Sequence, residues 1–281
     1  MSSANKTIHH LAPAYRQLRA SAPPSHVHLG VGNFFRSHLN FLTHCALAQE
    51  AEAPSPTTVT TATTNATNWT IHGIGSTTSP AEHQLHASLQ DQAGLYSLLS
   101  LPSATADVVG ALSSLSHTRT SSSGLHDSLE FLSSSNTKII SMTVTEKGYH
   151  QDNATGALDF TAPDVVQDVS TLSHHLGHGT SLDAPLNTTV GLLVAALGLR
   201  KQLSSPSEPR PVTLLCCDNL PHNGRVLQHL VLEMCDALDP ALATWVRDEA
   251  NVTFPNSMVG GSVSGVVFAT VHCLFVLIVA R

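Results

Sequence analysis

The sequence predicts an α/β fold, a largely parallel sheet with flanking helices, followed by an atypical hydrophobic C-terminal segment. Short β-branched runs alternate with longer segments of helical spacing, which favours parallel strands joined by helices. Residues 212–217 are continuously apolar, as in a strand that is buried on both faces of a parallel sheet. A Gly-x-Gly turn at Gly30 and Gly32 joins the first apolar run to an amphipathic segment.

This turn is typical of the opening unit of a dinucleotide-binding, Rossmann-like fold. Gly30 permits a tight turn, and Gly32 lets backbone amides approach a pyrophosphate because it has no Cβ. A helix beginning near Phe34 would direct its positive N-terminal end at that phosphate. Phe35 stands in place of the third glycine of G-x-G-x-x-G. Similar turns join strands to helices that bind nothing, so both interpretations stay open on these residues alone.

The elements in the first half of the chain follow from local patterns. Apolar residues at helical spacing predict a helix over residues 35–49, and an apolar run closed by glycines predicts a strand over residues 69–75. Residues 95–101 and 107–115 are predicted to form two short strands in a hairpin or edge pair. A serine-rich patch then leads into a predicted helix over residues 125–132.

The second half continues the alternation. Residues 138–145 are rich in β-branched side chains and predict a strand, which exits through residues 146–149. Apolar residues on one side predict helices over residues 164–176, 188–203, 226–238 and 240–250. The apolar strand at 212–217 lies between the second and third of these helices, and it ends in a polar loop.

Composition excludes several classes of protein. The chain has 281 residues with a formal charge of −7, which argues against a nucleic-acid partner. Its 5 cysteines form no C-x-x-C pair, and the N-terminus carries no apolar stretch of signal-peptide length. A cytoplasmic location is therefore expected. His174, His175 and His178 are the densest group among the 18 histidines, but they are expected to be surface residues and not metal ligands.

Four blocks, in the same order, resemble the motifs of one family. Residues 27–38 resemble H-[IL]-G-V-G-x-F-x-R-x-H, and residues 141–149 resemble S-L-T-[IV]-T-E-x-G-Y. Residues 217–224 resemble C-D-N-L-P-x-N-G, and residues 252–259 resemble V-x-F-P-N-x-M-V. Together they resemble the N-terminal Rossmann domain of the polyol-specific long-chain dehydrogenases, which include mannitol dehydrogenase and the fructuronate and tagaturonate reductases.

The resemblance implies an oxidoreductase that exchanges hydride between a nicotinamide coenzyme and a small polyol, ketose or uronate. It implies that Asn219 donates a hydrogen bond to the substrate oxygen, although the same residue could simply form an Asx-type turn after its strand. The residues expected to contact the coenzyme on this basis are Gly30, Val31, Gly32, Asn33, Phe34, Arg36, Thr143, Thr145, Glu146 and Asn219.

The choice between NAD and NADP is less clear from the sequence. Family members place an acidic residue shortly after the second strand, where it binds the ribose hydroxyls. Here residues 76–80 contain no acid, and the first carboxylate is Glu82. No arginine takes that place either, so NAD is favoured and NADP stays open.

The catalytic base is expected to be missing from this chain. In the family it lies in a second, mainly helical domain with the motif K-x-x-x-x-N-x-x-H, whereas no lysine here follows Lys201. Lys147 is expected to be a solvated loop residue, since an unperturbed lysine is a poor base at neutral pH. A noncatalytic nucleotide-binding remnant, or a protein tethered to a membrane, is therefore the alternative to an active enzyme.

Residues 1–24 are expected to be an N-terminal extension, 25–259 the dinucleotide-binding domain and 260–281 a tail outside the family pattern. The tail includes residues 263–280, an uncharged apolar stretch that just reaches the length of a membrane-spanning helix. Three interpretations stay open for it: a departure of the reading frame from the family gene, structure buried against the domain, and a membrane anchor. A membrane partner is expected only through this stretch.

Overall fold

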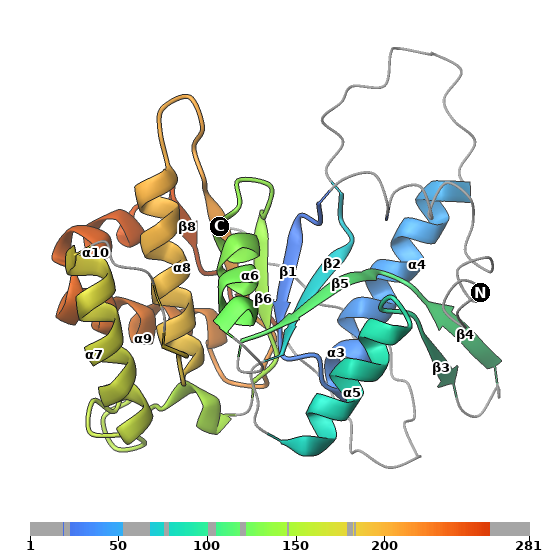
Figure 1. The fold of residues 1–281 in the computed structure, drawn as a ribbon, viewed down its shortest axis with the longest axis horizontal. Coiled ribbons are helices and arrows are strands. Elements are labelled where there is room, and N and C mark those ends of the chain that lie inside the picture. Colours follow the sequence, from blue (N-terminus) through green and yellow to red (C-terminus); the bar gives the residue numbers. More distant parts are fainter. Residues whose placement is uncertain are drawn as a thin grey trace.

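A computed structural model describes residues 19, 23–52, 68–75, 79–100, 105–118, 122–144, 146–178, 182 and 184–258. Its centre is a parallel six-stranded sheet, made of β1 (His26–Leu29), β2 (Ile71–Gly75), β5 (Leu112–His117), β6 (Ile139–Met142), β7 (Val212–Cys216) and β8 (Val252–Thr253) (Figure 1). The strands lie in the order β5-β2-β1-β6-β7-β8. When the strands are numbered along the sequence, this is the order 3-2-1-4-5-6 that is typical of dinucleotide-binding sheets. The order of the strands reverses between β1 and β6, although all of them are parallel. The predicted parallel α/β fold is confirmed.

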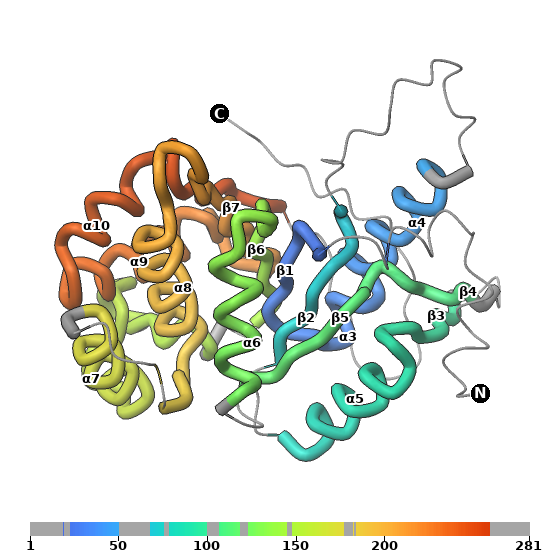
Figure 2. The backbone as a smooth tube through the Cα atoms, turned by 45° about the horizontal axis from the view of Figure 1, so that its top comes forward, coloured from blue at the N-terminus to red at the C-terminus, as the bar shows by residue number. Residues whose placement is uncertain are grey.

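Most of the helices beside this sheet form two groups, which lie toward opposite ends of the strand order (Figure 2). One group lies beside β1, β2 and β5 and consists of α3 (Asn33–Ser37), α4 (Leu39–Glu52) and α5 (Pro80–Asp91). The other lies toward β6 and β7 and consists of α7 (Pro163–His178), α8 (Thr189–Leu203), α9 (Asn223–Leu238) and α10 (Pro240–Arg247). Between the two groups, α6 (Ser122–Ser133) packs on β2 and β5 and against α8. A 3-10 turn, η1 (Glu146–Tyr149), follows β6. The larger hydrophobic core joins the second group to the sheet.

The structure departs from the predicted elements at three places. The single strand expected over 107–115 is two strands, separated at Gly110 and Ala111: β4 (Thr105–Val109) pairs antiparallel with β3 (Tyr96–Ser100), and β5 enters the main sheet beside β2. The helix expected over 35–49 is interrupted at His38. Helix α5 was not predicted, because its inner face buries only His86 and Leu89 and its apolar periodicity is correspondingly weak.

Helix α8 connects the two ends of the structure. Residues 190–197 are buried on every side of this helix, and its first turn lies at the carboxyl edge of the sheet. Near its other end, the fully buried guanidinium of Arg200 donates only to backbone carbonyls, at 2.8–3.0 Å: those of Leu132, Ser134, Thr137, Arg210 and Pro211. These bonds fix the loop before β6 and the loop before β7, and therefore the start of both strands.

Histidines occupy interior positions of two strands. His26 and His28 on β1 bond Ser141 on β6, and His72 on β2 bonds Ser114 and Ser116 on β5. Hydroxyl partners on the neighbouring strands thus compensate the burial of these imidazoles. Burial lowers the pKa of His26 to about 4 and that of His72 to about 3.

These depressed pKa values predict a loss of stability in mild acid. An imidazole that is neutral in the folded chain but titrates near 6.5 when unfolded stabilises the fold above that pH, and this contribution is lost as the pH falls. Between pH 8 and pH 5, His26 and His72 should each lower the free energy of unfolding by about 2 kcal/mol. Urea denaturation at several pH values measures this. A constant free energy of unfolding over that range would contradict it.

Several predicted segments lie outside the described residues: most of the N-terminal extension, and the tail from residue 259 onward. In the part of the chain that the structure describes, no helix has the length and apolarity needed to cross a bilayer.

Candidate functional site

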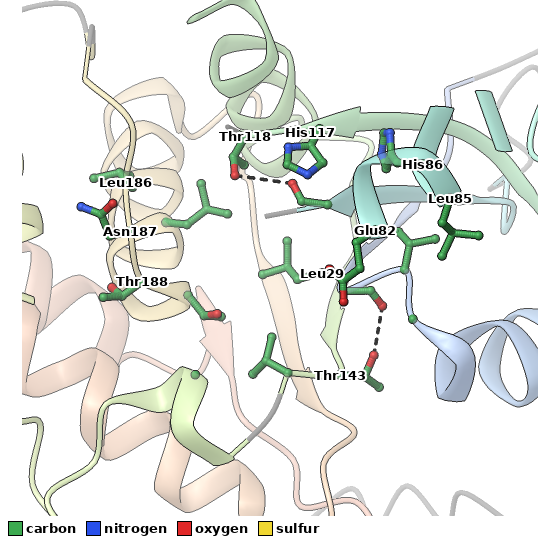
Figure 3. A pocket seen from close by; sticks show the side chains of 18 of the residues that line it. Leu29, Glu82, Leu85, His86, His117, Thr118, Thr143, Leu186, Asn187 and Thr188 are labelled. Carbon is green, nitrogen blue, oxygen red and sulfur yellow. Dashed lines mark hydrogen bonds between the residues drawn. The ribbon is translucent and has the colours of Figure 1, made fainter. Parts of the chain in front are cut away.

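A cavity of about 260 Å³ opens at the carboxyl edge of the sheet. Its floor is formed by the ends of β1, β2, β5 and β6, and its walls are formed by α5 on one side and by the start of α8 on the other (Figure 3). In an open parallel sheet this edge, at the point where the strand order reverses, is where ligands bind. Of the residues expected to contact the coenzyme, Gly30, Val31, Gly32 and Thr143 line this cavity.

The glycine turn lies at the mouth of the cavity, and its two glycines have different geometric roles. Gly30 has φ +95°, and a Cβ at this position would lie 2.3 Å from the Thr143 carbonyl oxygen. Its N–H donates to Ile74 and the Thr143 N–H donates to Leu29, both at 3.0 Å, so the turn is held from both neighbouring strands. Around Gly32, in contrast, a Cβ would meet no atom of the described residues within 4 Å. The backbone at Gly32 is therefore open to the cavity.

The residues that follow the glycine turn hold its backbone in place. Asn33, Phe34 and Arg36 are not among the described residues that line the cavity. The Arg36 guanidinium donates to the Val31 carbonyl at 2.7 Å and to the Asn33 side chain at 2.5 Å, so it ties the turn to α3. Phe35 is fully buried and stacks on the imidazole of His28. Helix α3 has only 5 residues, so the amides of its first turn are what it offers to an anion.

The opposite wall depends on one buried carboxylate. Asp168 on α7 accepts the backbone N–H of Asn187 at 2.7 Å, the backbone N–H of Thr188 at 2.8 Å and the Thr188 hydroxyl at 2.7 Å. Thr188 in turn caps α8 by accepting the N–H of Gly191. Burial raises the pKa of Asp168, and these hydrogen bonds act against that effect. Asp168 thereby fixes the position of Asn187 and Thr188, which line the cavity (Figure 3).

Asn219 lies beyond β7 at the same edge of the sheet, but it is exposed and is not among the described lining residues. Its neighbour Asp218 accepts the Val144 N–H at 3.1 Å and the hydroxyl of the buried Tyr149 at 2.5 Å. Val144 lines the cavity, so Asp218 connects the Asn219 loop to the cavity wall. Thr145 lies outside the described residues, and the side chain of Glu146 does as well.

The motif at residues 217–224 is hydrogen-bonded to the motif that begins at residue 252. The Asn223 side-chain amide donates to the Cys216 and Asp218 carbonyls, both at 3.1 Å, and its oxygen accepts the Ser257 N–H at 2.9 Å. A Cβ on Gly224 would lie 2.3 Å from the Pro255 carbonyl oxygen. Residues 252–258 of this motif therefore pack directly on the loop that carries Asn219 and help to fix its conformation.

Part of the lining was not predicted from the sequence. Glu82 and His86 come from α5, His117 ends β5 and Thr118 follows it, and the wall at residues 186–189 leads into α8. The imidazole of His117 makes edge contacts with His83 and His86 at ring distances of 4.8 and 5.2 Å. In the described part of the chain, no group of three or more His, Cys, Asp or Glu side chains is arranged to hold a metal ion.

Three features define a Rossmann-type dinucleotide-binding domain: the strand order, the positive φ of Gly30 at the switch point and the open backbone at Gly32. A comparison with known families agrees with this class. The family model described as "Mannitol dehydrogenase Rossmann domain" matches residues 24–277. The chain belongs to the mannitol dehydrogenase family.

Relatives of known name support the assignment. The chain is 32% identical over 244 residues to a mannitol 2-dehydrogenase of Cereibacter sphaeroides, covering 86% of this chain and 43% of that protein. It is 31% identical over 236 residues to a polyol:NADP oxidoreductase of Gluconobacter oxydans, covering 84% of this chain and 42% of that protein. The chain therefore spans less than half the length of these relatives.

Solved structures show the same similarity in three dimensions. A mannitol 2-dehydrogenase of Pseudomonas fluorescens, in a ternary complex with NAD and D-mannitol, is 26% identical with a TM-score of 0.66, covering 92% of this chain and 46% of that chain. A D-sorbitol dehydrogenase in substrate-free form is 31% identical with a TM-score of 0.67, covering 88% of this chain and 45% of that chain.

Proposed function

We propose that this chain is the coenzyme-binding part of a polyol dehydrogenase and binds NAD(H) in the cavity at the carboxyl edge of the sheet. The observation that carries the proposal is the open glycine turn at the mouth of that cavity. Gly32 leaves room for a pyrophosphate against the backbone, and Gly30 gives the turn a geometry that other residues adopt only with strain. The complex of the Pseudomonas mannitol 2-dehydrogenase with NAD supports the same coenzyme.

The proposed reaction is hydride transfer between the coenzyme and a secondary alcohol of a polyol, or the corresponding ketone of a ketose or uronate. The bound nicotinamide would supply or accept the hydride. Asn219 is proposed to donate a hydrogen bond to the substrate oxygen, since a neutral donor stabilises the negative charge that develops there. The names of the relatives, which include mannitol 2-dehydrogenases and a polyol:NADP oxidoreductase, favour a polyol substrate.

We further propose that the described residues of this chain do not include the catalytic base. Of its lysines, Lys138 donates to the Ser135 carbonyl and Lys201 pairs with Asp239 at 3.1 Å, and neither lines the cavity. The side chain of Lys147 lies outside the described residues. The alternative, a noncatalytic nucleotide-binding remnant, also predicts that this chain binds the coenzyme. It differs in predicting no hydride transfer even when a second domain is supplied. The domain boundary at residue 259, the nature of the tail and a cytoplasmic location stay predictions.

Two measurements on the 281-residue chain test the proposal. Titration of NADH, followed by its fluorescence, should show saturable binding. An assay of hydride transfer with mannitol and NAD, and with fructose and NADH, should show no turnover. If NADH does not bind, the proposed coenzyme site is wrong. If the chain turns over mannitol unaided, the proposal that it lacks its base is wrong.

Glu82 should favour NAD over NADP. Its side chain comes from α5 and lines the cavity (Figure 3), as does Gly75 at the end of β2. A carboxylate there would accept hydrogen bonds from ribose hydroxyls and repel a 2′-phosphate. Glu82→Gln should therefore narrow the preference for NADH over NADPH by about tenfold, which corresponds to roughly 1.4 kcal/mol. Asp91→Asn, at the other end of the same helix, is the matched control. An unchanged ratio of the two affinities would assign coenzyme choice to other residues.

A further inference from the structure

A chain of hydrogen bonds runs through the centre of the sheet and ends at the glycine turn. His26 Nε2 lies 2.6 Å from the Ser141 hydroxyl, which lies 2.6 Å from His28 Nδ1. His28 Nε2 lies 2.9 Å from the Thr143 hydroxyl, which donates to the Gly30 carbonyl at 3.1 Å. The strand register places His28 directly beside Ser141, so the parallel pairing of β1 and β6 brings these groups together.

The last acceptor fixes the direction of every hydrogen bond in this chain. A carbonyl only accepts, and the Thr143 hydroxyl has a single hydrogen, which it gives to Gly30. Thr143 must therefore accept from His28 Nε2, and a neutral His28 that carries its proton there must accept at Nδ1 from the Ser141 hydroxyl. Ser141 in turn accepts from His26 Nε2. All the protons point toward Gly30.

Burial keeps the groups of this hydrogen-bond chain neutral and holds them in place. Ser141 and His28 are fully buried, and burial lowers the pKa of His28 well below its ordinary value. The His28 ring also stacks on Phe35, with ring centroids 4.0 Å apart and planes 12° apart. Phe35, which stands where a third glycine is usual, thus holds the imidazole in the plane that the two hydrogen bonds need.

We infer that His28 and Ser141 are positioning residues for the coenzyme, acting through Thr143 on the Gly30 peptide. This inference rests on the proposed function of the cavity. A peptide group is planar and trans, so holding the Gly30 carbonyl against Thr143 also fixes the direction of the Val31 N–H. Val31 lines the cavity, and backbone N–H groups of this turn are the donors that a pyrophosphate would meet. Neither His28 nor Ser141 is among the described residues that line the cavity.

Ser141→Ala tests the inference, with Ser128→Ala as the matched control. Ser128 is also fully buried and also belongs to a histidine–serine chain, through Ser116 to His72, but its hydroxyl donates to the Gly124 carbonyl, away from the glycine turn. Both variants lose one buried hydroxyl. Ser141→Ala removes the hydrogen bonds to His26 and His28 and should weaken NADH binding about fivefold to tenfold, whereas Ser128→Ala should change it less than twofold.

The outcomes separate this inference from the proposed function. If the unmodified chain does not bind NADH, the proposed function fails. If it binds and Ser141→Ala binds equally well, or if both variants weaken binding alike, the positioning role is wrong. A second measurement does not depend on the coenzyme or on any variant. The ¹⁵N shifts of the His28 ring in the unmodified chain should show a neutral imidazole with its proton on Nε2, and a proton on Nδ1 would overturn the directed chain.

Discussion

Gly32→Ala should weaken NADH binding by about tenfold to one hundredfold and leave the stability of the chain unchanged or slightly higher. In the part of the chain that the structure describes, the added Cβ meets no atom within 4 Å, and φ at this residue is −75°, so the fold accommodates alanine. In the complex, the methyl group would occupy the space proposed for the pyrophosphate, and such overpacking costs about 1–3 kcal/mol. Fluorescence titration measures the affinity, and thermal denaturation measures the stability.

Gly30→Ala provides the contrasting control, because the same substitution two residues earlier should act on the fold. Its Cβ would lie 2.3 Å from the Thr143 carbonyl oxygen, at a residue with φ +95°. This variant should lose stability by at least about 2 kcal/mol and lose binding with it. If Gly32→Ala bound NADH as well as the unmodified chain does, the coenzyme would not approach this turn.

Arg200→Met should lower the free energy of unfolding by roughly 3–5 kcal/mol. Methionine fills much of the same volume but donates nothing, so five bonds to buried or partly buried carbonyls are lost together. Burial lowers the pKa of Arg200 to about 10, so the guanidinium is still charged at neutral pH and its bonds are of the strong, charge-assisted kind. Urea denaturation at pH 8 measures the change.

The neighbouring Lys201→Met is the matched control for this prediction. Lys201 makes an ion pair with Asp239 at 3.1 Å, and both side chains are about one-third exposed. Such a pair is worth at most about 1 kcal/mol, so this variant should stay close to the unmodified chain. Equal effects of the two substitutions would show that Arg200 does not clamp the loops before β6 and β7.

The sequence was sufficient for the class of fold, because glycine turns, β-branched runs and helical spacing are local patterns. It was insufficient where structure depends on partners distant in the chain. β4 and β5 are separated at Gly110 and Ala111, and only the pairing of β5 with β2 shows that the second of them belongs to the main sheet. Helix α5 escaped prediction because most of its surface is exposed and an exposed helix carries little apolar periodicity.

The sequence predicted the backbone turn of the site but not most of the side chains that form the walls of the cavity. Gly30, Gly32 and Thr143 follow directly from motifs beside strand ends. The sequence indicates Glu82 only as the first carboxylate after the second strand, and His117 is the last residue of β5, two residues beyond the predicted end of that strand. Asn187 and Thr188 reach the cavity because Asp168 on α7 holds them there, and no local sequence pattern predicts this contact between α7 and the segment before α8.

The one-way order of the polar groups between His26 and Gly30 also constrains how this protein can change over evolutionary time. A substitution at Ser141 leaves its neighbour on each side with a proton or a lone pair that has no counterpart in a region without solvent. Such a sequence position cannot drift independently. Among homologous proteins, the residues that correspond to His28, Ser141 and Thr143 should be exchanged as a set, or should persist together.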